Sequence, residues 1–153
     1  MGVFVAGAGH LFMDLVRVET RLWNAVDARL QAEHGLRLGQ FDLMTVIAGR
    51  DDCRVLDLVR EIAITVGAAS KSVDRLVAAG WCHRLANPAD GRSSFLELTP
   101  EGNRVLAGAR HAYEEEVAWW TSRVVPRETL AQTADALRTI RAALEDAQGA
   151  GGD

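Results

Sequence analysis

The longest amphipathic pattern of the chain runs from Ala8 to about His34. Its apolar residues recur every three or four positions, the spacing that places them on one face of an α-helix. They are Leu11, Leu15, Val18, Leu22, Val26 and Leu30. Phe12, Val16 and Trp23 make this apolar face too wide for one neighbouring element to cover. Gly35, a residue typical of helix C-termini, follows. The pattern predicts one long helix that contacts more than one neighbour.

Three shorter helical patterns follow in the middle of the chain. The first opens at Leu38 and ends at Gly49, and the second is a short run from Val55 to Ile62. Thr65 is a suitable N-cap for the third, because its hydroxyl can accept a hydrogen bond from a free backbone N–H of the first turn. Gly80 ends this third helix. Its predicted buried positions are Ala69, Val73, Leu76 and Ala79.

The next segment alternates between apolar and polar residues and predicts a β-hairpin. The two predicted strands are Trp81–Leu85 and Ser94–Leu98. Between them, residues 87–91 read Asn-Pro-Ala-Asp-Gly, a composition typical of a turn. A short helix pair followed by a hairpin predicts a winged helix-turn-helix, a shape that can place one helix in the major groove of DNA and the hairpin beside it.

Two helices are predicted in the C-terminal part. Thr99, Pro100 and Glu101 form a strong start signal, with a capping hydroxyl, a proline at the first helical position and an acid in the first turn. This helix is expected to run to about Val125, before Pro126. Apolar residues at helical spacing define the last helix: Leu130, Ala134, Leu137, Ile140 and Leu144.

The predicted fold is therefore mainly α with a small β-hairpin wing and about six helices. We expect a single domain over residues 1–153, with the winged helix-turn-helix at 36–99, dimerisation helices at 3–35 and 100–147, and a flexible tail at 148–153. The long outer helices carry more apolar surface than a small winged domain can bury. A homodimer follows from this surplus.

The net charge of −4 alone would argue against nucleic-acid binding, but the charges are unevenly distributed along the chain. Between Thr65 and Phe95 stand four basic residues and two acidic ones, so this segment carries +2 and the remainder −6. Because binding depends on the local field over the contact surface, an acidic protein with one basic face can bind DNA.

Other sequence features bear on location. Met1–Met13 is apolar, but no basic residue precedes it and Asp14 follows, so we interpret it as the start of a helix and not as a signal peptide. No apolar run is long enough to cross a membrane. Cys53 and Cys82 form neither a CxxC motif nor a disulfide framework, which indicates a reducing, cytoplasmic compartment.

The residues from Leu38 to Gly102 resemble the MarR (multiple antibiotic resistance regulator) family of bacterial winged-helix transcription factors. The matching positions are Leu38 with Gln40-Phe41, Leu58 and Ile62, Val73-Asp74-Arg75-Leu76 with Ala79-Gly80, Arg84, Asp90-x-Arg92, and Leu98-Thr99-Pro100-Glu101-Gly102. One departure is Gly91, which stands where a second wing arginine commonly follows the aspartate. The wing is therefore expected to be less charged and more flexible.

The resemblance implies a DNA interface on the third short helix and on the wing. The expected DNA-binding residues are Thr65, Ala68, Ser70, Lys71, Arg75, Asn87 and Arg92. Asp90 and Arg84 are expected to position the wing, with Asp90 holding Arg75 or Arg92 by a charge-assisted pair. The expected partners are double-stranded DNA with an inverted-repeat operator, a second copy of the chain and a small-molecule effector.

The resemblance also implies that this effector is a small aromatic or phenolic compound that releases a repressor from DNA. His10, Arg17, Trp23 and Tyr113 are candidate effector-binding residues, because a cation, a hydrogen-bond donor and aromatic rings can together hold an aromatic acid. From the residues alone, structural roles for these four side chains are favoured over effector binding.

Two alternatives remain open: a winged-helix protein-interaction module with weak or no DNA binding, and a thiol-based redox-responsive regulator. Cys53 lies beside two aspartates, which disfavours a reactive thiolate. The sequence contains no set of nucleophile, base and orienting group and no phosphate-binding glycine loop, so it does not predict an enzyme. Only His111 and Glu115 have helical metal-ligand spacing, and two groups do not make a metal site. No cofactor is expected.

Overall fold

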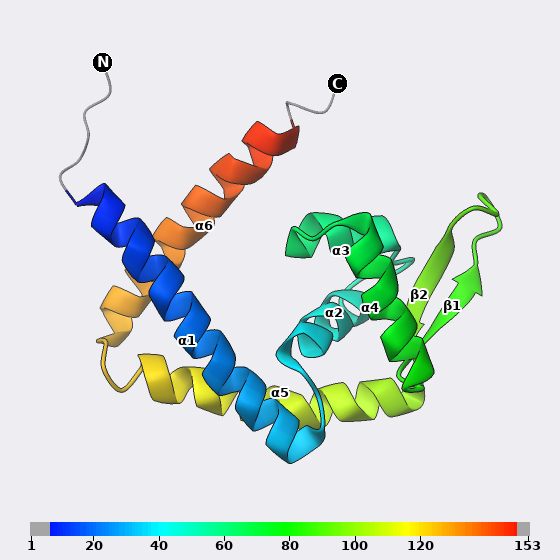
Figure 1. Cartoon of the computed structure of the whole chain (residues 1–153), viewed down its shortest axis with the longest axis horizontal. Coiled ribbons are helices and arrows are strands. Elements are labelled where there is room, and N and C mark those ends of the chain that lie inside the picture. Colours follow the sequence, from blue (N-terminus) through cyan, green and yellow to red (C-terminus); the bar gives the residue numbers. More distant parts are fainter. Residues whose placement is uncertain (1–6, 150–153) are drawn as a thin grey trace. The chain divides into compact units, whose positions relative to one another are not determined.

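A computed structural model describes residues 7–149, which form six helices and one two-stranded hairpin (Figure 1). The elements in chain order are α1 (Ala8–His34), α2 (Leu38–Ala48), α3 (Val55–Ile62), α4 (Val66–Ala78), β1 (Cys82–Ala86), β2 (Ser94–Leu98), α5 (Pro100–Thr121) and α6 (Arg127–Gly149). The predicted fold class, mainly α with a small hairpin, is confirmed. The predicted helical segment before residue 7 and the predicted tail at 150–153 lie outside the described residues.

The chain divides into two compact units, Met1–Glu116 and Val117–Asp153. In the first unit α2 contacts α1, α3, α4 and β2, and α4 contacts β1. Its core is built from fully covered apolar side chains of several elements: Leu30, Leu36, Met44, Leu58, Val73 and Leu76. The winged region is therefore assembled around α2, which has buried side chains along its whole length.

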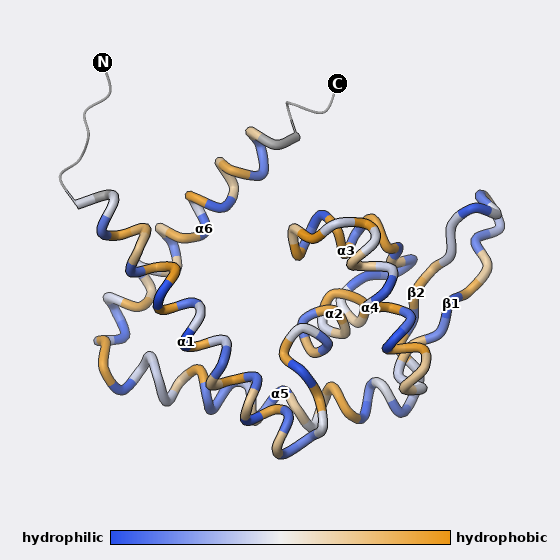
Figure 2. The backbone as a smooth tube through the Cα atoms, viewed as in Figure 1, coloured by the Kyte–Doolittle hydropathy of each residue, from blue (hydrophilic) through white to orange (hydrophobic). Residues whose placement is uncertain are grey.

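Helix α1 is covered in its C-terminal half and uncovered in its N-terminal half. Val26 and Leu30 are 2% and 0% exposed, whereas Leu11, Phe12 and Val18 are 65%, 62% and 59% exposed. Figure 2 shows hydrophobic residues recurring along the helix. The amphipathic pattern thus continues beyond the part of α1 that the first unit covers.

Local hydrogen bonds fix where the helices of the winged region begin and end. Gly35 closes α1 in the left-handed conformation, at φ 61°; its N–H donates to the carbonyl of Gln31, and the N–H of Leu36 donates to the carbonyl of Leu30. The Asp27 carboxylate then accepts from the N–H of Leu38 at 2.8 Å and from Arg37 at 2.8 Å. Asp57 caps α3 by accepting from the N–H of Arg54. These contacts set the turns that position α2 and α3.

Some element boundaries and one buried position differ from the sequence prediction. Strand β1 begins at Cys82, because the Trp81 N–H donates to Leu76 O and belongs to the α4 terminus, where Gly80 has φ 77°. Ala79, predicted to be buried, is exposed at the same terminus. Helix α5 ends at Thr121 instead of Val125. The α-helical backbone conformation is disfavoured for a residue that precedes proline. Val125 precedes Pro126, so the helix ends before Val125.

The second unit contains the end of α5 and all of α6, and exposes most of its large apolar side chains. Trp119 and Trp120 are 55% and 53% exposed, and the Arg123 guanidinium lies over the Trp119 ring, 3.6 Å from its centroid. On α6, Leu137, Ile140 and Leu144 are 40%, 48% and 58% exposed. Helix α6 continues through residues 148 and 149, which were assigned to the tail. The predicted apolar stripe of α6 is present but has no cover within this unit.

Candidate nucleic-acid interface

Helix α4 is capped as the sequence predicts. The Thr65 hydroxyl accepts a hydrogen bond from the N–H of Ala68 at 3.2 Å, and Thr65 itself has extended backbone geometry. A cap of this kind satisfies one of the free N–H groups of the first turn. Thr65 and Ala68, two of the predicted DNA-binding residues, therefore share one hydrogen bond at the start of the helix, and both are exposed.

The buried and exposed residues of α4 separate cleanly. Ala69, Val73 and Leu76 are fully buried and anchor the helix. Lys71 and Arg75 are exposed, and neither has an ion-pair partner among residues 7–149. Ser70 is half-buried between the two groups. The only lysine of the chain and one arginine thus lie off the buried stripe and keep their charges for an external partner.

Arg84 of β1 is held by an acidic residue of α4. Its Nη2 donates to Asp74 Oδ1 at 2.9 Å, and its Nη1 donates to Ser94 Oγ at 3.4 Å. This arrangement joins α4 to both strands of the hairpin. It also compensates the negative charge of Asp74, so the carboxylate is not left alone beside Lys71 and Arg75. Sequence reasoning assigned Arg84 to wing positioning but did not identify Asp74 as its partner.

The wing loop is held together by side chains of its own residues. Asn87, which is 8% exposed, donates to Ser93 Oγ at 2.8 Å and accepts from the N–H of Ala89 at 3.0 Å. The Asp90 carboxylate accepts from the N–H of Arg92 at 3.0 Å. Ser93 donates from both its N–H and its hydroxyl to the Asp90 carbonyl.

These contacts change two of the expected roles. Asp90 shapes the loop through a backbone N–H and forms no ion pair with Arg75 or Arg92 among the described residues, because an aspartate can accept from the amide two positions ahead. Asn87 uses both ends of its amide within the wing, which leaves little of it for DNA. Arg92 is exposed beside them. The wing is thus a bonded loop that presents one arginine.

Thr99 and Gly102, which follow the hairpin, connect the start of α5 to the end of α4. The Thr99 hydroxyl donates to Gly80 O at 2.7 Å and accepts from the N–H of Gly102 at 3.0 Å, which caps α5. A Cβ placed on Gly102 lies 2.0 Å from the carbonyl oxygen of Trp81. Only glycine fits at that distance. The motif therefore fastens the first turn of α5 to the end of α4.

The four candidate effector-binding residues do not form one site in the described part of the first unit. His10 and Arg17 are on the exposed N-terminal half of α1, where Arg17 lies 3.6 Å from Asp14. Trp23 lines a shallow cavity of about 310 Å³ with Glu19, Thr20 and Asn24. The Tyr113 ring stacks on Phe41 with centroids 4.8 Å apart.

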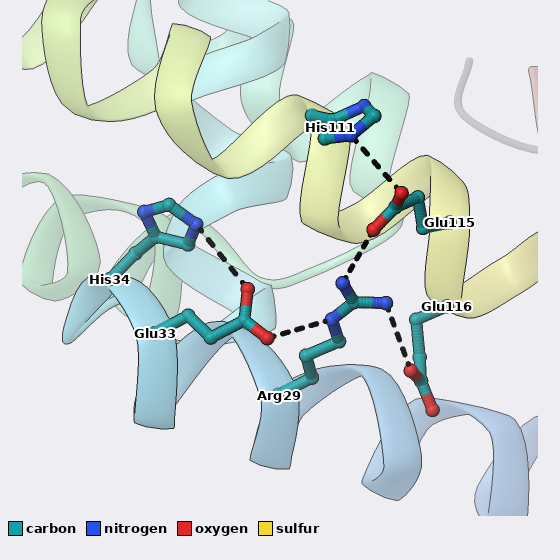
Figure 3. A network of polar contacts seen from close by, with 6 residues as sticks. All are labelled: Arg29, Glu33, His34, His111, Glu115 and Glu116. Atoms are coloured by element: carbon teal, nitrogen blue, oxygen red, sulfur yellow. Dashed lines mark hydrogen bonds and ion pairs between the residues drawn. The ribbon is translucent and has the colours of Figure 1, made fainter.

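A charged cluster that the sequence analysis missed joins α1 to α5 (Figure 3). Arg29 donates to Glu115 at 2.6 Å, Glu33 at 3.0 Å and Glu116 at 3.3 Å. His111 lies 3.1 Å from Glu115 on the other side. The hydrogen bond from Arg29, with the nearby His111, lowers the pKa of Glu115. The spacing of four residues between Arg29 and Glu33 could have predicted that ion pair, but no local pattern in the sequence connects Arg29 with Glu115.

Both cysteines are buried and free. Burial, with a contribution from Asp57, raises the pKa of Cys53 to about 11, and burial also raises the pKa of Cys82. A reactive thiol needs a lowered pKa and access to solvent. Neither condition is met. In the part of the chain that the structure describes, no three His, Cys, Asp or Glu side chains are grouped to hold a metal ion, and no helix is long and apolar enough to cross a membrane.

A capped helix with two free cations, tied by an ion pair to a hairpin with an exposed arginine, defines a winged helix-turn-helix protein. Residues 36–94 match the model of the MarR family, which confirms the resemblance predicted from the sequence. The winged-helix segment of this chain is therefore similar to the proteins of that family.

Similar proteins extend the comparison. The multiple antibiotic resistance protein MarR of Salmonella typhimurium is 33% identical over 63 residues, which are 41% of this chain and 44% of that protein. The chain thus matches less than half the length of this curated relative. Sco3205 of Streptomyces coelicolor, a MarR family regulator solved in complex with DNA, has a TM-score of 0.84 at 23% identity and covers 94% of this chain and 91% of its own.

A third similar protein is CouR of Rhodococcus jostii RHA1, solved with p-coumaroyl-CoA bound. It has a TM-score of 0.75 at 19% identity, over 90% of this chain and 95% of its own. At these identities the solved structures establish the fold, and the fold extends beyond the segment that the family model matches.

Proposed function

We propose that this protein is a homodimeric transcriptional regulator that binds an inverted-repeat DNA operator. The observation that carries the proposal is the pair Lys71 and Arg75, exposed and without ion-pair partners in the described chain, on a helix whose neighbouring Asp74 is compensated by Arg84. On a recognition helix such cations meet phosphates or the guanine edge in the major groove. The DNA complex of Sco3205 supports the same use of this fold.

The wing supplies the second part of the interface. Arg92 is exposed at the tip of a loop bonded by Asn87, Asp90 and Ser93. A guanidinium suits a narrow, electronegative minor groove, where groove width favours A·T pairs. We assign Arg92 to the minor groove that flanks each half-site.

A second copy of the chain is the expected cover for the exposed apolar residues of the outer helices. In the first unit these lie on the N-terminal half of α1, and in the second on the end of α5 and on α6. Single exposed apolar residues are ordinary, but a continuous stripe marks an interaction surface. Light scattering at micromolar concentration should give the mass of a dimer, and a monomer mass would contradict this part of the proposal.

The proposed effector is a small aromatic compound that relieves repression. CouR was solved with p-coumaroyl-CoA, whose acyl group carries a phenol ring. In this chain Trp23 provides an exposed ring at a cavity of about 310 Å³. A ligand that binds only the folded state raises its stability, so thermal unfolding in the presence of a panel of aromatic acids and their thioesters identifies candidates.

The decisive experiment is a mobility-shift titration with the promoter region next to the gene of this protein, repeated at several salt concentrations. We expect saturable binding, competition by unlabelled specific duplex, and a linear decrease of the logarithm of affinity with the logarithm of salt. No binding to this region or to duplexes selected from a random library would favour a protein-interaction module instead. A cytoplasmic location follows from the proposed role.

A further inference from the structure

The first turn of α4 contains no side chain that can hydrogen-bond. It begins Val66-Gly67-Ala68, directly after the Thr65 cap, and all three residues are exposed. Val66 is 53% exposed, more than Val77 at 39% near the other end of the helix. An apolar side chain this exposed contributes little to the core of the first unit.

Packing does not require the small residues of this turn. A Cβ placed on Gly67 meets no heavy atom within 4 Å, and Gly67 is not in the left-handed region. Glycine is less favourable in helices than alanine, so the fold alone gives no reason for it here. A bare position instead allows another surface to approach the helix backbone closely.

We infer that the first turn of α4 reads the methyl group of thymine through Val66, with Gly67 allowing the close approach. The inference rests on the proposed function, because it names the base chemistry that the same interface selects. The residues at the start of a recognition helix contact base edges in the major groove. The C5 methyl of thymine is the apolar feature of that groove, and Val66 has no group that could recognise a donor or acceptor there.

The polar atoms of this turn support the assignment. The Thr65 hydroxyl is engaged with the N–H of Ala68, and the N–H of Ala69 donates to Thr65 O. Within the helix itself, side chains that can hydrogen-bond begin only at Ser70 and Lys71, after the first turn. The base pairs facing residues 66–68 are therefore selected by apolar contact, and those facing Lys71 by hydrogen bonding.

Replacing thymine by uracil removes only this methyl group and tests the inference directly. The probe is a duplex that the protein selects from a randomised library, resynthesised with uracil at one thymine position per half-site at a time. Burial of one methyl contributes ~0.8 kcal/mol, which corresponds to about a fourfold loss of affinity for each contacted thymine. We expect this loss at one position in each half-site and no loss at thymines elsewhere.

Variants assign the effect to Val66. In Val66→Ala, which shortens an exposed side chain and leaves the core intact, the uracil and thymine duplexes should differ by less than about twofold, since most of the methyl contact is gone. Val77→Ala is the matched control, an exposed valine of the same helix outside the first turn, and should keep the full difference. Circular dichroism confirms that both variants are folded.

Other outcomes overturn the inference. A wild-type protein that binds its selected duplex but is insensitive to uracil at every thymine would refute methyl readout and leave the proposed function standing. An uracil effect of equal size in wild type and Val66→Ala would remove Val66 from that role. Failure to select any duplex would refute both the inference and the proposed function.

Discussion

Nη2 of Arg84 lies 2.9 Å from Oδ1 of Asp74, so the hairpin is joined to α4 by an ion pair beside the residues proposed to meet DNA. Asp74 is the more exposed partner, with 66% of its side chain accessible against 32% for Arg84. Without Arg84, an uncompensated carboxylate would stand beside the cations proposed to meet DNA. The pair therefore affects both the position of the wing and the charge of α4.

Arg84→Ala should weaken DNA binding while changing the free energy of unfolding by less than about 1 kcal/mol, because an exposed pair contributes little to stability. Adding Asp74→Asn to Arg84→Ala should restore part of the affinity, since it removes the uncompensated charge. Anisotropy titrations with the four proteins of this cycle, together with urea unfolding, measure both quantities. A double variant that binds no better than Arg84→Ala would show that Asp74 does not face DNA.

Lys71→Ala and Arg75→Ala should each weaken DNA binding without unfolding the protein, because both side chains lie off the buried stripe. A cation that reads a base edge is worth about 1–3 kcal/mol per contact and its loss relaxes sequence preference, whereas loss of one phosphate contact in each protomer lowers the salt slope of the dimer by about 2 for all sequences. Arg110→Ala on α5, also exposed, is the control and should bind as wild type does. Unchanged binding in both α4 variants would exclude α4 as the recognition helix.

Much of the helical architecture was predictable because its signals are local. The stripe of α1, the Thr65 cap and the Thr99-Pro100 start each act within a few residues, and the structure confirms all three. The misplaced ends of α5 and of β1 depend on how one turn closes. Such closures are set by φ at Gly80 and by the restriction before Pro126, which periodicity does not reveal.

The polar contacts were less predictable than the fold, because each charged side chain has several possible partners, both near and distant in sequence. The expected partner of Asp90 was an arginine, but the nearest available donor was a backbone N–H. Arg84 and Asp74 are ten positions apart, and Arg29 and Glu115 are eighty-six apart. Charged residues at the surface offer several possible partners, and only the packing of the elements selects one.

Gly102→Ala should destabilise the protein, and Gly108→Ala on the same helix should not. A Cβ at Gly102 lies 2.0 Å from Trp81 O, a backbone atom held by the hydrogen bond from Thr99, so overpacking should cost about 1–3 kcal/mol. At Gly108 a Cβ meets the His34 ring at 3.6 Å, an ordinary contact, so alanine should stabilise the helix by up to ~1 kcal/mol. Urea unfolding measures the stability of both variants. A Gly102→Ala variant as stable as wild type would contradict the close approach of Gly102 to Trp81.

Cys53 should make stability fall at alkaline pH. Its pKa is raised to about 11 from an ordinary 9.0, chiefly by burial, so the folded state holds the thiol proton more tightly than the unfolded state. This contribution is fully present below pH 9 and is lost as the pH rises towards 11, by roughly 2–3 kcal/mol. Urea unfolding between these pH values measures the decline, and Cys53→Ala should flatten it.

The same burial predicts slow thiol chemistry. Alkylation of native protein near neutral pH should leave Cys53 and Cys82 unmodified, whereas both should react in denaturant. Rapid modification of either cysteine in the folded protein, accompanied by loss of DNA binding, would instead support the alternative of a redox-responsive regulator.

Gly91→Arg should strengthen DNA binding without loss of stability. Gly91 does not have a positive φ, and a Cβ placed on it meets no heavy atom within 4 Å, so an arginine fits the wing as it stands. The new guanidinium would stand next to Arg92 and place a second cation beside the minor groove. If it neutralises one phosphate in each protomer, the salt slope of a dimer should steepen by about 2. Gly91→Ala controls for the backbone and should leave the slope unchanged, while Gly91→Glu should weaken binding. Equal affinities for the arginine, alanine and glutamate variants would show that the wing tip lies away from DNA, and the role proposed for Arg92 would fail with it.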